Sequence, residues 1–141
     1  MSIQVVLDAP QTPARAASVK SMQLAMAGKG EEWLELFAED AVVQDPYGRS
    51  AFDPEGRGHR GKDAIRKFCA AHIRPGGIGF EIRQTLTSGE ACVNIGTIVS
   101  KRPDGGVQWS EVVNVYEVDA EGWIVLLRSY WDFEAASKTA F

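Results

Sequence analysis

The sequence predicts one α+β domain in which three helices come first and a mainly antiparallel sheet follows. Before residue 74, apolar residues recur at helical spacing, and from Ile78 onward they alternate with polar residues as in half-buried strands. A chain of 141 residues, 45% of them hydrophobic, can bury a core without a disulfide or a metal ion to hold it. This order of elements places the helices together on one face of the sheet.

The first helix is expected over residues 13–27, because Thr12 is a typical N-cap and is followed by proline. A second, short helix begins at two glutamates and offers Trp33 and Phe37 to the core. The third helix is expected over residues 61–73, where apolar side chains again return at helical spacing.

Strands account for the rest of the predicted domain. A brief strand over residues 41–46 ends at a proline, and the polar, glycine-rich residues 47–60 form a loop. The segments about 1–12 and 133–141 are expected to be tails of the single domain 1–141. Four longer strands, joined by turns, are expected over residues 78–86, 91–101, 107–118 and 123–132.

Composition excludes several classes of function. Fifteen basic and nineteen acidic residues give a net charge of −4, which argues against nucleic acid or an anionic membrane as a partner. Two cysteines and two histidines are too few for zinc fingers, iron–sulfur clusters or three-histidine metal sites. The longest apolar run is far shorter than a membrane span, and the first residues do not resemble a secretion signal. We therefore expect a cytoplasmic protein that uses no metal and no cofactor.

Asp45 is the first candidate catalytic residue, and the sequence around it allows two interpretations. It shares a strand face with Val43, so a core-facing carboxylate there would have the raised pKa of a general base. The segment Asp45-Pro-Tyr-Gly48 also has the sequence of a β-turn, which would explain the aspartate without catalysis.

Two further polar residues lie where apolar neighbours are expected. Asn114 falls between Val112 and Tyr116 on one strand face, either as a structural hydrogen-bonding group or as a donor into a cavity. Ser21 lies on the inner face of the first helix, where close packing is the default explanation. The segment 56–61 matches the pattern G-x-G-x-x-G but lacks a preceding apolar strand, so it predicts a loop rather than a dinucleotide site.

The stretch Glu32-Trp-Leu-Glu-Leu-Phe-Ala-Glu-Asp-Ala-Val-Val-Gln-Asp-Pro-Tyr-Gly48 resembles the ketosteroid isomerase branch of the NTF2-like (SnoaL-like) superfamily. The segments Gly58–Phe68 and Leu127–Trp131 are similar to later parts of the same family, and the resemblance extends over about residues 18–132. It implies a cone in which three helices wrap against a strongly curved mixed sheet. It also implies a deep apolar pocket and a homodimer.

The resemblance assigns roles to three residues. Asp45 occupies the position of the base that moves a proton between two carbons of a steroid. The positions of the two oxyanion donors, a tyrosine and a protonated aspartic acid in the family, fall on Ser21 and Asn114. Asparagine can still donate through its amide, whereas serine is too short to replace a phenol, so Tyr116 or Tyr130 is the expected substitute. The long loop 48–61 is expected to form either a lid or an extra hairpin, with Phe52 as an apolar plug.

The implied function is binding of a steroid-like or other polycyclic apolar ligand, with weak Δ5-isomerase activity. Alternatives are another enzyme on the same scaffold, such as a polyketide cyclase, dehydratase or epoxide hydrolase, or a non-catalytic dimeric module. The dimer interface would use Trp109, Val113 and Val115 on the outer sheet face. The pocket lining is expected to include Phe37, Val43, Tyr47, Phe68, Val112, Tyr116 and Trp131.

Overall fold

The computed structural model describes residues 9–102, 104–132 and 134–135. Its helices are α1 (Pro13–Ala27), α2 (Gly30–Leu34) and α3 (Gly61–His72). Its strands are β1 (Phe37–Gln44), β2 (His59–Arg60), β3 (Ile78–Ser88), β4 (Ala91–Lys101), β5 (Val107–Val118) and β6 (Ile124–Tyr130).

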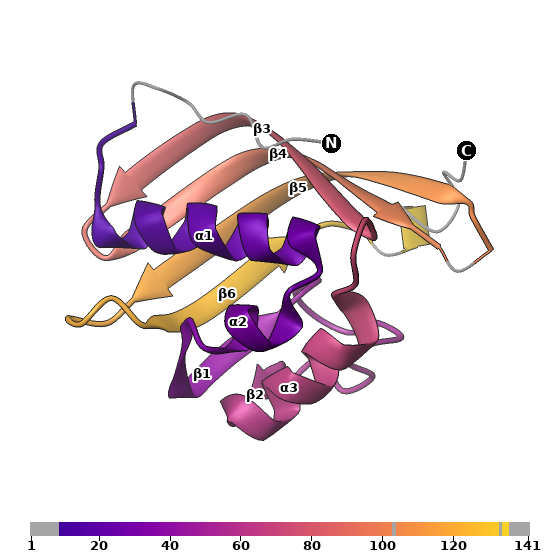
Figure 1. The fold of residues 1–141 in the computed structure, drawn as a ribbon, viewed down its shortest axis with the longest axis horizontal. Helices are drawn as coiled ribbons and strands as arrows, with labels where there is room; N and C mark the ends of the chain where they lie inside the picture. The colour runs from indigo at the N-terminus through magenta and orange to yellow at the C-terminus, as the bar shows by residue number, and fades with distance from the viewer. Residues whose placement is uncertain (1–8, 103, 133, 136–141) are drawn as a thin grey trace.

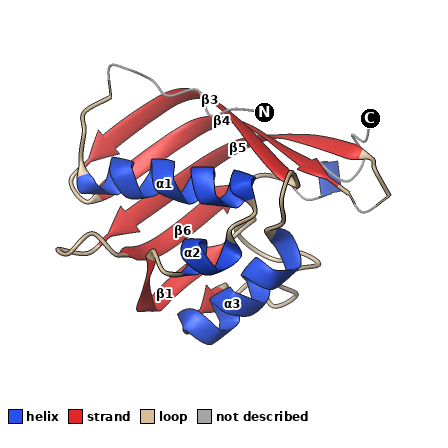
Figure 2. Ribbon diagram, in the orientation of Figure 1, coloured by secondary structure: helices blue, strands red, loops and turns tan. Residues whose placement is uncertain are grey.

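The strands form one sheet in the order β2-β1-β6-β5-β4-β3. β1 runs parallel to β6, and the other neighbouring pairs are antiparallel. α1 lies across the long strands, α3 packs on β1, and α2 contacts both α1 and α3 (Figures 1 and 2). The predicted α+β architecture, with three helices against a mixed and mainly antiparallel sheet, is confirmed. No helix in the described part of the chain has the length and apolar character to cross a membrane.

α1 begins and ends as the sequence predicts. The Thr12 side chain accepts a hydrogen bond from Arg15 N at 3.1 Å, and Gly28 ends the helix with a φ of 72°. A Cβ at Gly28 would come within 2.1 Å of Pro75 N, so only glycine allows the end of α1 to approach the segment between α3 and β3 so closely.

The prediction that Phe37 belongs to the second helix is wrong, because Phe37 is the first residue of β1. It pairs with Ile124 of β6, and Ile124 N donates to Leu36 O at 2.9 Å. The parallel strand that supplies this pairing is 87 positions further along the chain, so local pattern does not reveal it. Phe37 is 1% exposed and packs on Trp33, with the ring centroids 4.5 Å apart.

Other expected boundaries also change. β1 ends at Gln44, so Asp45 follows the strand instead of lying within it, and the expected loop contains the short strand β2. The last strand ends at Tyr130 rather than at residue 132. Within the expected N-terminal tail, Ala9 is buried and its carbonyl accepts a hydrogen bond from Arg15 Nη1 at 2.6 Å. Residues 1–8, 133 and 136–141 of the expected tails lie outside the described part.

Candidate functional site

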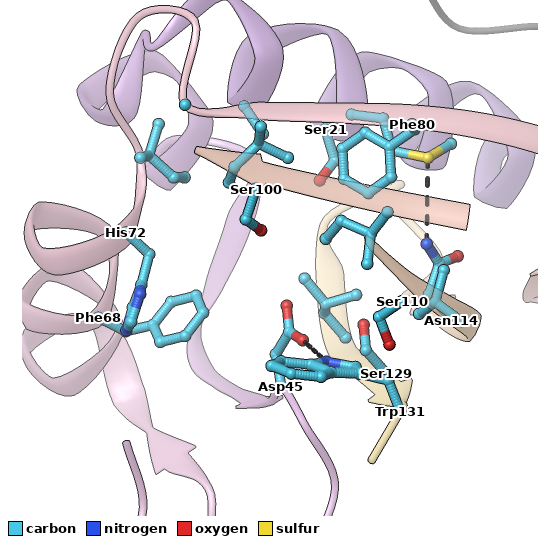
Figure 3. Close-up of a pocket in the computed structure, with 18 of the residues that line it drawn as sticks. Ser21, Asp45, Phe68, His72, Phe80, Ser100, Ser110, Asn114, Ser129 and Trp131 are labelled. Atoms are coloured by element: carbon cyan, nitrogen blue, oxygen red, sulfur yellow. Dashed lines mark hydrogen bonds between the residues drawn. The ribbon is translucent and has the colours of Figure 1, made fainter. Parts of the chain in front are cut away.

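A cavity of about 350 Å³ lies between the helices and the concave side of the sheet (Figure 3). Most of its walls are apolar, and they come from α1, α3 and strands β3 to β6. We define the closed end as the buried lining residues Ser21, Met22, Asn114, Tyr116 and Ser129. We define the mouth as the exposed lining residues Phe52, Ala71, Arg74, Lys101 and Trp109.

Asp45 enters the cavity from the end of β1 and is held by the neighbouring strand β6. Gln44 pairs with Arg128, and beyond the strand Tyr47 N donates to Ser129 O at 2.7 Å. Just past β6, Trp131 Nε1 donates to Asp45 Oδ1 at 2.7 Å (Figure 3). The carboxylate is therefore fixed in position by the indole before any ligand arrives.

The surroundings of Asp45 favour the protonated form more than water does. Burial raises the pKa of Asp45, while hydrogen bonds from Trp131 and Ser129 and the charge of His59 act in the opposite direction. A carboxylate of this kind is a stronger base than an ordinary surface aspartate, which suits proton abstraction from carbon. The β-turn alternative leaves the carboxylate unexplained: the side chain is turned to Trp131, and no hydrogen bond joins Asp45 O to Gly48 N within residues 45–48.

His59 lies near enough to Asp45 for its charge to act on the carboxylate, although it is not among the residues that line the cavity. β2 places it directly opposite Val43, so the two side chains share the inner face of the sheet next to Asp45. Its ring packs on Phe68 with centroids 4.9 Å apart, and its Nε2 is buried without a hydrogen-bond partner among the described residues. A two-residue strand inside a glycine-rich loop leaves no periodic pattern, so no signal could have predicted this placement.

Ser21 does not act alone at the closed end. Its Oγ accepts a hydrogen bond from Trp33 Nε1 at 3.0 Å and shares another with the Tyr116 hydroxyl at 2.9 Å. Burial, and to a lesser extent the negative charge of Asp45, raises the pKa of Tyr116, so the phenol stays protonated. The expected substitution of a β5 tyrosine for the missing α1 tyrosine is therefore geometrically available, through Tyr116.

Asn114 is oriented by a second asparagine. Asn94 Nδ2 donates to Asn114 Oδ1 at 2.8 Å and to Ser18 Oγ at 2.7 Å, while Thr85 donates to Asn94 Oδ1 at 2.8 Å. With its oxygen engaged, Asn114 directs its amide nitrogen toward Met22 Sδ, 4.0 Å away, at the cavity wall (Figure 3). The amide is thus presented as a hydrogen-bond donor to the cavity. Asn94 also escaped the sequence analysis, because a buried amide in an alternating strand resembles an ordinary polar position.

The structure separates the expected lining residues into two groups. Phe68, Val112, Tyr116 and Trp131 line the cavity. Phe37, Val43 and Tyr47 are not among its lining residues: the first two are buried in the core behind it. Tyr47 is 52% exposed and packs on Tyr130, with ring centroids 5.3 Å apart. Tyr130 is likewise off the cavity, which removes it as the substitute donor.

The long loop contributes to the mouth through Phe52. This side chain lines the cavity and meets the ring of His72 edge-on, with centroids 4.4 Å apart. The His72 ring in turn contacts Phe68 at 4.6 Å between centroids, and burial lowers the pKa of His72. An uncharged aromatic stack therefore forms one side of the opening. In the described residues, no three histidine, cysteine or acidic side chains are grouped so that they could hold a metal ion.

The chain matches the family model of the SnoaL-like domain over residues 20–127, and it therefore belongs to the SnoaL-like family. Among solved structures, it is similar to RV0760c from Mycobacterium tuberculosis in complex with estradiol-17beta-hemisuccinate. The identity is 30%, over 93% of this chain and 99% of that one, with a TM-score of 0.82. It is similar as well to the Δ5-3-ketosteroid isomerase from Mycobacterium sp., at 32% identity over 93% and 98% of the two chains, with a TM-score of 0.81.

A third similar structure is a computationally designed 17-OHP binder. It is 27% identical over 94% of this chain and 97% of that one, with a TM-score of 0.80. No curated protein sequence matches the chain.

Proposed function

We propose that this protein binds a steroid-like ligand in the cavity and slowly isomerises Δ5-3-ketosteroids, with Asp45 as the general base. The observation that carries the proposal is the position of Asp45: a held carboxylate in an apolar cavity whose lining also offers two hydrogen-bond donors. The named ligand and activity of the similar mycobacterial structures support it.

The reaction needs a base and an oxyanion site at the same time. Asp45 would remove a proton from the carbon between the ketone and the double bond, then return it at the far end of the double bond. The negative charge that forms on the ketone oxygen would be stabilised by the Tyr116 hydroxyl and the Asn114 amide, which both project from β5. No cofactor is required, because the same carboxylate accepts and donates the proton.

The rate is expected to be low because the donors differ from a tyrosine and a protonated acid. A misplaced oxyanion donor costs about 10²–10³ in rate. The Tyr116 hydroxyl is partly committed to Ser21, and an asparagine amide is a weaker donor than a carboxylic acid. The proposed function is therefore mainly steroid binding, accompanied by slow turnover.

The test follows the absorbance of the conjugated enone formed from a Δ5-3-ketosteroid. We expect measurable turnover in the wild type and none above background in Asp45→Asn, with steroid binding retained because asparagine still accepts the Trp131 hydrogen bond. The kcat/KM profile should fall on the acid side with a midpoint above 3.8, the ordinary value for aspartate.

Asp40→Asn is the matched control, since Asp40 is an exposed aspartate on β1, the strand that Asp45 follows. Turnover that survives Asp45→Asn would remove Asp45 from the mechanism, and binding without turnover in the wild type would leave a steroid-binding protein.

We further expect a homodimer that forms through the outer face of the sheet. On this face Val113 and Val115 are half-buried and pair with Ile95 and Val93, which gives a continuous apolar surface. Trp109, the third residue expected there, also lines the cavity mouth. Sedimentation equilibrium should report twice the chain mass, and a mass of one chain would contradict the dimer.

A further inference from the structure

The mouth of the cavity carries a concentration of positive charge. Arg74, Lys101 and Arg102 all line the opening, whereas the only acidic lining residue is Asp45, within the described part of the chain. This is unusual for a protein of net charge −4, in which acidic residues outnumber basic ones. Cations that gather at an opening attract a ligand of opposite charge and retain the charged part of it there.

The three cationic side chains differ in how far a nearby carboxylate compensates their charge. Arg102 Nε lies 3.4 Å from Asp104 Oδ1, so its charge is partly compensated. Arg74 donates through Nη2 to the carbonyl oxygen of Lys101, an uncharged partner that positions the guanidinium beside Lys101. In the described residues, neither Arg74 nor Lys101 forms a salt bridge with a carboxylate. These two cations therefore remain available to an anion.

The inner face of β5 sets the distance between the cations at the mouth and the polar side chains at the closed end. Alternate residues from Tyr116 through Asn114 and Val112 to Gln108 line the cavity, so they form a row from the closed end to the mouth. Ser129 pairs with Asn114, which places Asp45 at the closed end of that row, and Ser100 pairs with Gln108 next to Lys101. Six residues of strand between Asn114 and Gln108 correspond to roughly 20 Å.

We infer that the ligand is an amphiphile: a steroid-like ring system with a carboxylate or another anionic group on a side chain that reaches the mouth. The ring end lies against Asp45, Asn114 and Tyr116, and the anion lies between Arg74 and Lys101. This rests on the proposed function, since it names the class of ligand that the same cavity takes. It makes Arg74 and Lys101 specificity-determining residues, which contact the ligand far from the reacting atoms.

The test compares two probes that differ by one methyl group and in charge, estradiol-17β-hemisuccinate and its methyl ester, by titration calorimetry at low ionic strength. We expect the wild type to bind the acid about tenfold more tightly than the ester, and added salt to reduce this ratio. Lys101→Gln should lower the ratio about threefold, and Arg74→Gln with Lys101→Gln should bring it near one. Lys20→Gln is the matched control, because Lys20 is exposed on α1 and does not line the cavity.

The two proposals fail in different ways. Equal affinity of the wild type for acid and ester would overturn the anionic ligand and leave the steroid-binding cavity in place. A ratio that Lys20→Gln lowers as much as Lys101→Gln would also overturn it, since overall charge would then be the cause. If neither probe binds, the proposed function fails, and the assignment at the mouth fails with it.

Discussion

The closed end and the mouth of the cavity differ in the burial and hydrogen bonding of their polar side chains. At the closed end, Ser21, Asn114 and Tyr116 are buried, and each is hydrogen-bonded to a second polar side chain. At the mouth, Lys101 and Trp109 are exposed, and Trp109 is 41% accessible. Groups that stabilise charge in a reaction need this prior orientation, whereas exposed cations attract the charge of a ligand at the surface. The comparison predicts that substitutions at the closed end change rate and stability, and substitutions at the mouth change affinity alone.

The largest effect is expected from removal of the closed-end phenol. Tyr116→Phe deletes the stronger of the two proposed donors, so isomerase turnover should fall about 10²-fold while steroid affinity changes little. Steady-state kinetics on a Δ5-3-ketosteroid measures both. Tyr130→Phe is the control, because Tyr130 lies off the cavity. Undiminished turnover in Tyr116→Phe would place the donor elsewhere.

A loss of stability should follow from Asn94→Ala. This change leaves Asn114, Ser18 and Thr85 without their shared partner in a buried site, at a cost of about 2–3 kcal/mol in the free energy of unfolding. Urea denaturation measures it, with Gln84→Ala on the exposed side of β3 as the control. A change below about 0.5 kcal/mol would mean that the network is not required for stability.

Asp45→Asn should stabilise the fold while it removes activity. Because burial raises the pKa of Asp45, the unfolded chain releases this proton at lower pH than the folded chain does. The folded state therefore loses stability as pH rises from 3.8 through the raised pKa, and the variant escapes that loss.

We expect the variant to be more stable than the wild type at pH 7, with a higher Tm, and to show no gain below pH 3.8. Thermal unfolding at several pH values measures the difference. An equal gain in Asp40→Asn would show that general charge reduction is responsible.

The smallest effect should come from the mouth. Lys101→Gln should leave the free energy of unfolding within about 0.5 kcal/mol of the wild type, because the side chain is exposed and bound to no carboxylate among the described residues. The same urea titration provides the measurement. A larger loss would mean that the mouth, like the closed end, contributes to the fold.

The sequence predicted most of the secondary structure because its periodic signals are strong. α1, β4 and β5 match the expected residues throughout, since caps, turns and alternation mark them locally. The start of β1 could not be predicted, because Phe37 is part of a strand only through its pairing with Ile124 of β6. The family resemblance supplied what local pattern lacked, namely the curved mixed sheet and the cavity.

The candidate site was predictable where the family resemblance or an alternating strand face marked a position. Asp45, Ser21 and Asn114 were found by position, and all three line the cavity. The hydrogen bonds that hold these three side chains were not predicted, since the bonds from Trp131, Trp33 and Asn94 join residues 12 to 86 positions apart. The position of His59 near Asp45 was the hardest to predict, because it depends on the pairing of the two-residue strand β2 with β1.

The parallel contact between β1 and β6 also sets the order in which a newly made chain can become competent. Asp45 leaves the ribosome well before Trp131, its indole partner 86 residues later. Until then the helices and the β3–β4–β5 meander can form, but the carboxylate has no partner strand beside it. A chain truncated after Val118 would lack both β6 and Trp131, and so the contacts that hold Asp45. The carboxylate of Asp45 therefore gains its neighbouring strand and its indole partner only once β6 and Trp131 have docked.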